Sequence, residues 1–200
     1  YSYPATVEIR IDRRASDVCY TDMTDRPEYG AALIMTAKGI MAGVPVGDDT
    51  LFSPDGTVTR AEFVAMALKN VGVRRDTTLT ATCFDDDGEI PASLRGYVAT
   101  AQRIGVVNGS FSGGKLLFRP NDPVTKYEAA SILAALTGAK ADGDTAAFAD
   151  ADTVPAWARP GVLAMISGGI FRTTDGKIGA DAKVTRAETA VWLCRIADKT

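Results

Sequence analysis

The chain has 200 residues, of which 46% are hydrophobic and 24% are charged, and its formal net charge is −3. A chain of this size can bury a hydrophobic core, and its acidic balance shows no basic stripe for a nucleic-acid groove. The absence of histidine excludes Ser-His-Asp and Cys-His catalysis and His-ligated zinc. The three cysteines form no CxxC pair, so we interpret them as buried free thiols, with a disulfide as the alternative.

Residues 1–16 precede the repeated part of the chain and are predicted to be a tail or the end of a preceding domain. Apolar and charged residues alternate over residues 5–12, which favours a half-buried strand. The longest apolar run, residues 29–46, is interrupted by a lysine and two glycines, so no membrane span is predicted. Because the chain starts at Tyr1 rather than at a methionine, we expect it to be part of a longer protein with a fused effector domain.

A short signature recurs three times and divides the rest of the chain into similar units. It ends in threonine, a cation, any residue and glutamate, and it occupies residues 52–62, 118–128 and 178–188. An aromatic-x-Asp motif precedes each copy, at residues 20–22, 84–86 and 148–150. Such self-similarity is typical of repeat proteins, so we assign the units to residues 17–80, 81–144 and 145–200.

Each unit is predicted to contain two helices. The first opens near a proline and closes at a glycine, over residues 27–40, 91–104 and 155–170. The second begins at a threonine that is followed three residues later by glutamate, in the pairs Thr59/Glu62, Thr125/Glu128 and Thr185/Glu188. This is the capping-box pattern, and each box stabilises its helix by about 1 kcal/mol.

The second helices carry apolar residues on more than one side, which predicts that they are buried. Trp192 is therefore expected in the core rather than on a ligand-binding surface. Three equivalent buried helices in one chain predict a mostly α fold, in which three helix-loop-helix repeats surround a central three-helix bundle with approximate threefold symmetry.

A cation follows each N-cap threonine, at Arg60, Lys126 and Arg186. A positive charge there faces the positive end of the helix macrodipole, which costs roughly 0.3–1 kcal/mol, so we expect its removal to leave stability unchanged or slightly raised. A cation beside free N-terminal N–H groups favours anion binding, and arginine offers a planar fork that matches a carboxylate. The alternative is an ion pair with an aspartate of a nearby loop, namely Asp55, Asp122 or Asp181.

The Thr-Arg-Ala-Glu signature, the aromatic-x-Asp opening and the Gly-Ile-x-x-Gly turn together resemble the S-layer homology (SLH) family, over residues 17–200. The resemblance implies a pseudo-threefold, three-pronged fold in which one helix of each repeat builds the central bundle. It also implies a secreted bacterial protein of the cell wall or cell surface. Its partner would be a secondary cell-wall polysaccharide bound in grooves between prongs, with pyruvylated N-acetylmannosamine as the favoured ligand.

The resemblance assigns glycan binding to residues in matching positions of the repeats. They are the cation after each cap, the second glycine of the turn, the opening aspartates and an aromatic residue near the first helix: Arg60, Lys126, Arg186, Gly43, Gly109, Asp22, Asp86, Asp150, Trp157 and Tyr29. The aspartates have an equally good alternative, which is to cap the first helix or to tie a loop.

Units two and three depart from the family pattern, so we expect the three grooves to be unequal. Unit two has Lys126 and Tyr127 in place of Arg-Ala. Unit three has Thr173 in place of the second glycine, and Ile178 and Ala180 in place of the Phe-x-Pro residues. Only unit one has both the arginine and the two glycines.

The sequence is also compatible with functions other than non-catalytic anchoring to the cell wall. The main alternative is a structural self-assembly module of a surface (S-layer) lattice without direct glycan binding. A calcium site is suggested by the acidic runs 48–49 and 85–87, but an EF-hand loop from Asp85 has Ile90 and Gly96 at its sixth and twelfth positions and fails. The chain consists of three similar units, has no histidine and offers no unique pair of carboxylates, so no enzyme activity is predicted. No cofactor or metal is expected either.

Overall fold

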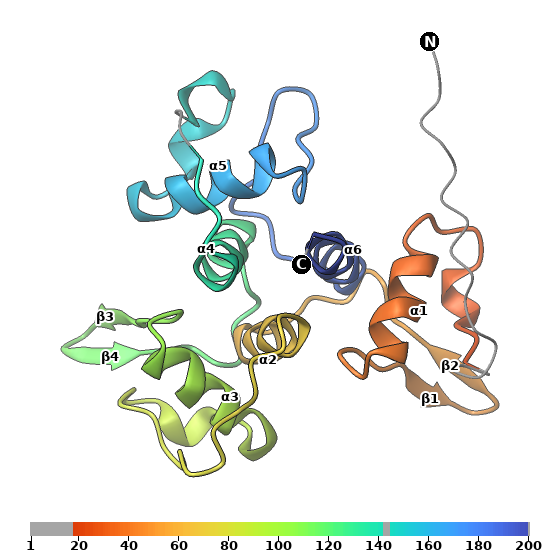
Figure 1. Cartoon of the computed structure of the whole chain (residues 1–200), viewed down its shortest axis with the longest axis horizontal. Helices are drawn as coiled ribbons and strands as arrows, with labels where there is room; N and C mark the ends of the chain where they lie inside the picture. Colours follow the sequence, from red (N-terminus) through yellow and green to blue (C-terminus); the bar gives the residue numbers. More distant parts are fainter. Residues whose placement is uncertain (1–17, 142–144, 200) are drawn as a thin grey trace.

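The computed structural model describes residues 18–141 and 145–199, so the strand predicted within residues 1–16 lies outside the described part. The described chain is mostly α-helical, as predicted, with two short β-hairpins (Figure 1). Its α-helices are α1 (Tyr29–Ala37), α2 (Arg60–Asn70), α3 (Ala92–Arg103), α4 (Lys126–Thr137), α5 (Arg159–Ser167) and α6 (Arg186–Ala197). The hairpins pair β1 (Val44–Val46) with β2 (Asp49–Leu51), and β3 (Ser110–Ser112) with β4 (Lys115–Leu117). Short 3-10 turns are η1 (Thr21–Met23), η2 (Asp87–Glu89), η3 (Thr145–Ala147), η4 (Ala151–Thr153) and η5 (Ala156–Ala158).

The helices α2, α4 and α6 begin where the capping boxes predicted. At α2 the Glu62 N–H donates to Thr59 Oγ1, and the Thr59 N–H donates to Glu62 Oε2 at 2.9 Å. The same reciprocal pair forms at the start of α4 and of α6. The local sequence therefore sets the first residue of all three helices.

Replacing Glu62 with alanine is expected to lower the free energy of unfolding by about 1 kcal/mol, because the Thr59 N–H loses its acceptor. Urea unfolding of the variant and the parent measures this loss. Glu128→Ala is the matched comparison and should cost more, since Glu128 both caps α4 and forms an ion pair with Arg60. Equal losses in the two variants would show that the ion pair adds nothing to stability.

The first helix of each unit is shorter than predicted. In unit three, α5 begins only at Arg159, because residues 156–158 form the separate turn η5 with Trp157 at its centre. The predicted stop signals are confirmed: a glycine with positive φ follows each helix, with values of 65° at Gly39, 76° at Gly105 and 67° at Gly169. Glycine adopts this conformation without the steric cost that a Cβ would bring.

The helices α2, α4 and α6 lie side by side at the centre of the molecule, each seen nearly end-on in Figure 1. Most of their buried residues belong to one hydrophobic cluster, in which Trp192 is 4% exposed, as expected. A closed ring of backbone hydrogen bonds joins the segments that precede them. Val58 N–H donates to Val184 O (3.0 Å), Val184 N–H to Val124 O (2.9 Å) and Val124 N–H to Val58 O (2.9 Å).

Each outer helix packs on a central helix of the preceding unit rather than on that of its own unit. Thus α3 packs on α2, α5 on α4, and α1 on α6. At the crossing of α5 and α4 a Cβ on Gly161 would lie 3.0 Å from Ser131 Cα, so glycine allows the close approach. Each peripheral lobe is therefore completed by a neighbouring repeat, which makes the three units interdependent.

Backbone carbonyl groups from the next unit satisfy the first N–H groups of each central helix. In α2 the Arg60 N–H donates to Asp122 O at 3.0 Å, and the Ala61 N–H donates to Pro120 O at 3.1 Å. Equivalent bonds join α4 to Ala182 and Ala180, and α6 to Gly56 and Pro54. The expectation of free N-terminal N–H groups beside the cations is therefore wrong, because the loops of neighbouring repeats occupy them.

Candidate functional site

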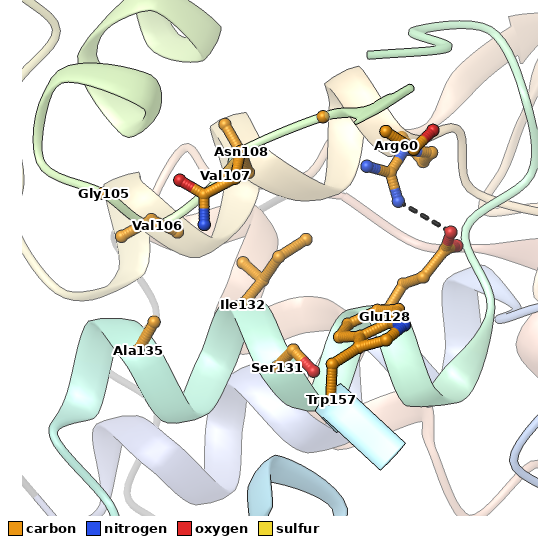
Figure 2. A pocket seen from close by; sticks show the side chains of 12 residues that line it. Arg60, Gly105, Val106, Val107, Asn108, Glu128, Ser131, Ile132, Ala135 and Trp157 are labelled. Carbon is orange, nitrogen blue, oxygen red and sulfur yellow. Dashed lines mark ion pairs between the residues drawn. The ribbon is translucent and has the colours of Figure 1, made fainter. Parts of the chain in front are cut away.

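Three of the predicted site residues line one groove of about 510 Å³: Arg60, Gly109 and Trp157. They come from different units, since Arg60 starts α2, Gly109 follows α3 and Trp157 lies in η5. The floor is formed by α4, and the groove continues into a smaller hollow of about 190 Å³ that shares all three residues. Residues that the sequence analysis did not identify complete the lining, among them Asn108, Glu128, Ser131 and Ile132 (Figure 2).

Arg60 is held in place by contacts to unit two. Its Nε donates to Phe118 O at 2.9 Å, its Nη1 lies 2.8 Å from Glu128 Oε1, and its guanidinium carbon lies 5.2 Å from the centroid of the Phe118 ring. Figure 2 shows the ion pair reaching across the groove. Since Nη2 makes no hydrogen bond with the described residues, this end of the fork is free to donate to a ligand. These three contacts lead us to expect that removing Arg60 lowers stability, rather than leaving it unchanged.

Trp157 presents an exposed aromatic surface beside the groove. Its side chain is 63% exposed, although it lies next to Glu128 and Ser131 in Figure 2. The ring of Tyr127 meets it edge-to-face at a centroid distance of 5.7 Å. Tyr127 replaces the alanine of the Thr-Arg-Ala-Glu signature, so this departure in unit two supports the orientation of the tryptophan.

The corresponding cations of the other units also reach into the next repeat. Lys126 Nζ donates to Ile178 O at 2.8 Å and to Arg172 O at 3.3 Å. Arg186 donates from Nε to Phe52 O and from Nη2 to Ala42 O, both at 2.7 Å.

Burial lowers the pKa of Lys126 and that of Arg186, and nearby carboxylates oppose both shifts. None of the three cations pairs with the loop aspartates considered as alternatives. Asp55 instead pairs with Arg26. Each of the three cations therefore links its own repeat to the following one.

The opening aspartates fasten the loop that ends just before each central helix. Asp86 is 8% exposed and accepts the N–H groups of Phe118 (2.9 Å) and Arg119 (2.7 Å). Asp22 accepts the N–H groups of residues 52 and 53 in the same way, and Asp150 those of residues 178 and 179. Burial would raise the pKa of Asp150, but these backbone donors hold that pKa below its ordinary value. The loop-tie interpretation of the aspartates is thus supported.

The second glycine of the turn makes room for the aromatic residue of the opening motif. A Cβ on Gly109 would lie 2.7 Å from the Phe84 ring and 2.9 Å from Leu117 O, and the φ of this residue is 68°. A Cβ on Gly43 would lie 2.3 Å from the Tyr20 ring. The immediate reason for glycine at both places is therefore packing within the repeat.

Replacing Gly109 with alanine is expected to destabilise the protein by about 2 kcal/mol or more, because the new methyl group clashes with a ring and a carbonyl while φ is positive. Gly105→Ala is the control, since φ is also positive there but no atom lies within 4 Å of the added Cβ. Thermal unfolding of both variants separates the clash from the backbone strain. A Gly109→Ala variant as stable as Gly105→Ala would disprove the packing explanation.

Comparison with known proteins identifies the repeats. The sequence model of the S-layer homology domain matches residues 20–64 and 147–190. The chain carries S-layer homology domains. The middle unit is not matched by that model, yet it has the same capping box, aspartate tie and glycine turn as the other two.

Relatives of the SLH chain include named enzymes and a surface-layer protein. They are the exoglucanase XynX of Acetivibrio thermocellus (28% identical over 92% of this chain and 16% of the relative), the amylopullulanase of Thermoanaerobacterium thermosulfurigenes (26%, 92% and 10%) and the surface-layer 125 kDa protein of Lysinibacillus sphaericus (31%, 77% and 13%). The chain thus spans less than a sixth of each of these relatives. The matches indicate a bacterial protein associated with the cell surface or cell wall.

Two of the departures from the SLH pattern, Lys126 and Thr173, fall on the same pair of neighbouring repeats. Lys126 faces the turn of unit three, where Thr173 replaces the second glycine, because each cation reaches into the following repeat. Arg60 and Arg186 instead face units with the second glycine, Gly109 and Gly43. In unit three, Trp157 is the second residue after Pro155 and lines the Arg60 groove. The equivalent residue of unit two is Ser93. The Arg60 groove therefore combines the arginine, both glycines and the tryptophan.

Tyr29, the predicted counterpart of Trp157 in unit one, is not part of the Arg60 groove. Its hydroxyl lies 3.6 Å from Cys19 Sγ. The hollow around Lys126, about 520 Å³, is bordered instead by the neighbouring residues Arg26 to Glu28.

The acidic run of unit two is engaged by the protein itself. Asp85 accepts the Leu116 N–H at 2.6 Å, and Asp87 accepts the Thr82 N–H at 2.7 Å. Among the described residues no three His, Cys, Asp or Glu side chains gather as a metal site would require, so the calcium alternative gains no support.

The cysteines are free thiols, but the prediction of burial is wrong for Cys19 and Cys83, which are exposed. Within the described part, no helix has the length and apolar character needed to cross a membrane.

Proposed function

We propose that the chain is a non-catalytic anchoring module that binds an anionic secondary cell-wall polysaccharide, with the Arg60 groove as its principal site. In this proposal the units 17–80, 81–144 and 145–200 form a pseudo-threefold module. This module would carry a fused effector domain to the cell wall. The observation that carries the proposal is the convergence of Arg60, Gly109 and Trp157 from three repeats on one groove.

The charges around Arg60 suit a carboxylate such as that of a pyruvate ketal on N-acetylmannosamine. Glu128 neutralises part of the guanidinium but holds it by Nη1, which leaves Nη2 for a ligand. The adjoining hollow adds Arg119 and Lys183, so that its lining has three cations against two carboxylates. Asn108 and Ser131 supply side-chain polar groups for sugar hydroxyls.

A pyruvylated disaccharide and the same disaccharide without its ketal test this proposal by calorimetric titration. We expect the pyruvylated sugar to bind more tightly by roughly tenfold or more, the equivalent of one charge-assisted hydrogen bond. Equal affinity for the two sugars would show that Arg60 does not recognise the carboxylate.

Replacing Trp157 with alanine is expected to weaken sugar binding by about 0.5–1.5 kcal/mol, because an aromatic platform for the ring is lost. Stability should change by less than about 0.5 kcal/mol, since the side chain is 63% exposed. The matched control is Tyr29→Ala, which removes the counterpart that lies outside the Arg60 groove. Calorimetry on both variants checks the prediction, and an equal effect of the two would remove Trp157 from the site.

Self-assembly into a surface lattice is the second candidate function. It is favoured by exposed apolar residues on the two hairpins, with Phe111 81%, Val44 56% and Val46 52% exposed. Such side chains at separate tips would suit contacts between copies. Sedimentation velocity of the parent and of Phe111→Ser tests this function, because a lattice contact through the hairpins predicts oligomers that the substitution disperses.

A further inference from the structure

A second hollow of about 520 Å³ lies at the C-terminal end of α2, away from the Arg60 groove. Lys38 after α1, Lys69 in the last turn of α2, and Arg74 and Arg75 in the following loop line it, and Tyr97 of α3 forms part of its wall. We call this hollow the α2 basic pocket. Its lining has four cations and no carboxylate, although the net charge of the chain is −3.

The four cations have no anionic partner in the described part of the chain. None of them takes part in an ion pair there, whereas Arg26, Arg60, Arg95 and Arg103 do. Lys69 Nζ lies 5.5 Å and the Arg75 guanidinium carbon 5.8 Å from the centroid of the Tyr97 ring. One aromatic ring thus positions two of the positive charges at the pocket.

The location of the pocket explains how part of this charge is tolerated. Lys69 lies in the last turn of α2, and Lys38 is the C-cap of α1. Both face the negative end of a helix macrodipole, which favours a cation. Arg74 and Arg75 have no such compensation. The neighbouring carboxylate of Asp76 is already engaged, since it pairs with Arg103 and accepts the Thr78 N–H at 2.8 Å.

We infer that the α2 basic pocket is a second anion-binding site, which takes a phosphate group of an anionic cell-wall polymer. Four convergent cations without a carboxylate suit a phosphate better than a single carboxylate group, and arginine can bind phosphate oxygens through two N–H donors at once. A pocket of about 520 Å³ has room for the phosphate together with its attached polyol or sugar.

The pocket is separate from the Arg60 groove. Arg60 and Lys69 stand at opposite ends of α2, which puts their Cα atoms about 14 Å apart along the axis and about half a turn apart around it. One helix therefore carries a candidate anion site at each end. That this site serves wall attachment rests on the proposed function, whereas phosphate binding itself does not.

The test is calorimetric titration of the full chain with a poly(glycerol phosphate) fragment and, separately, with inorganic phosphate. The variant Lys69→Gln/Arg75→Gln removes two exposed cations of the pocket. We expect it to weaken polymer binding by at least about tenfold, as the loss of one charge-assisted hydrogen bond would do. The control Lys115→Gln/Lys140→Gln removes the same charge from exposed positions outside the pocket and should change affinity by less than about twofold.

Several outcomes would overturn the inference. Equal losses in the two double variants would mean diffuse charge attraction rather than a pocket. Binding of inorganic phosphate without binding of the polymer would exclude a wall polymer. Tighter, pocket-dependent binding to vesicles of anionic lipid would replace the polymer with a membrane surface.

A loss of polymer binding in Arg60→Ala as large as that in Lys69→Gln/Arg75→Gln would move the phosphate to the Arg60 groove. Failure of the proposed function is seen separately, as unchanged binding of Arg60→Ala to a pyruvylated disaccharide, which carries no phosphate.

Discussion

Replacing Arg60 with alanine is expected to weaken binding of a pyruvylated disaccharide by about 1.5–3 kcal/mol, or roughly 10- to 150-fold. The reason is that the guanidinium supplies a charge-assisted donor, Nη2, which no group of the described chain uses. The same substitution should lower the free energy of unfolding by about 1–3 kcal/mol, because Glu128 and the Phe118 carbonyl lose their partner at a half-buried position. Calorimetry well below the unfolding midpoint separates the two effects.

The equivalent cations provide matched controls for this substitution. Arg186→Ala removes similar ties, to Phe52 and Ala42, so it should cost similar stability. It should cost less binding, because unit two has Ser93 at the position equivalent to Trp157 and so offers no aromatic ring there. Lys126→Ala should cost the least binding, since lysine lacks the fork and faces the unit without the second glycine. If all three variants bind like the parent, the cations are purely structural and the site assignment is wrong.

The largest loss of stability is expected for Asp86→Ala, at about 3 kcal/mol or more. The carboxylate is 8% exposed and accepts two backbone N–H groups, and the substitution leaves both donors without a partner. Since the total stability of a domain is only about 5–15 kcal/mol, this loss would be plain in urea unfolding. Binding should fall as well, because the loop that Asp86 fastens contains the Phe118 carbonyl to which Arg60 donates.

Asp22→Ala is the comparison for Asp86→Ala. Asp22 makes the same two bonds to the backbone but is more exposed, so water can replace the lost acceptor and the loss should be smaller. A loss of sugar binding without a loss of stability in Asp86→Ala would mean that the carboxylate contacts the ligand directly.

The starts of the central helices could be predicted because their determinants lie within four residues of one another. Thr59 and Glu62 form a capping box whatever the rest of the chain does, and the same holds in the other units. Glycines after the first helices were equally clear, since a positive φ at Gly105 needs no distant partner.

The hairpins and the exchange of helices between units could not be predicted in this way. Strands of three residues, such as β3 (Ser110–Ser112), are too short for an alternating pattern to be recognised. The packing of α5 on α4 depends on contacts between units, such as the approach of Gly161 to Ser131. Local sequence carries no record of these contacts.

The candidate site was predicted in its parts but not in its arrangement. The cation after each cap was found, yet its partners were not, because Glu128 belongs to the next repeat and was assigned only a capping role. Three residues of the Arg60 groove were named from the resemblance to the SLH family, but which units contribute to one groove follows only from the order in which the repeats pack.

Co-sedimentation with purified bacterial cell-wall sacculi, before and after mild acid removal of pyruvate ketals, tests the central claim most directly. The parent chain is expected to bind untreated sacculi and to lose most of that binding after the ketals are removed. Arg60→Ala, shown to be folded at the temperature used, should bind untreated sacculi weakly. Undiminished binding of the parent to ketal-free sacculi would contradict the claim that the Arg60 groove recognises a pyruvylated wall polysaccharide.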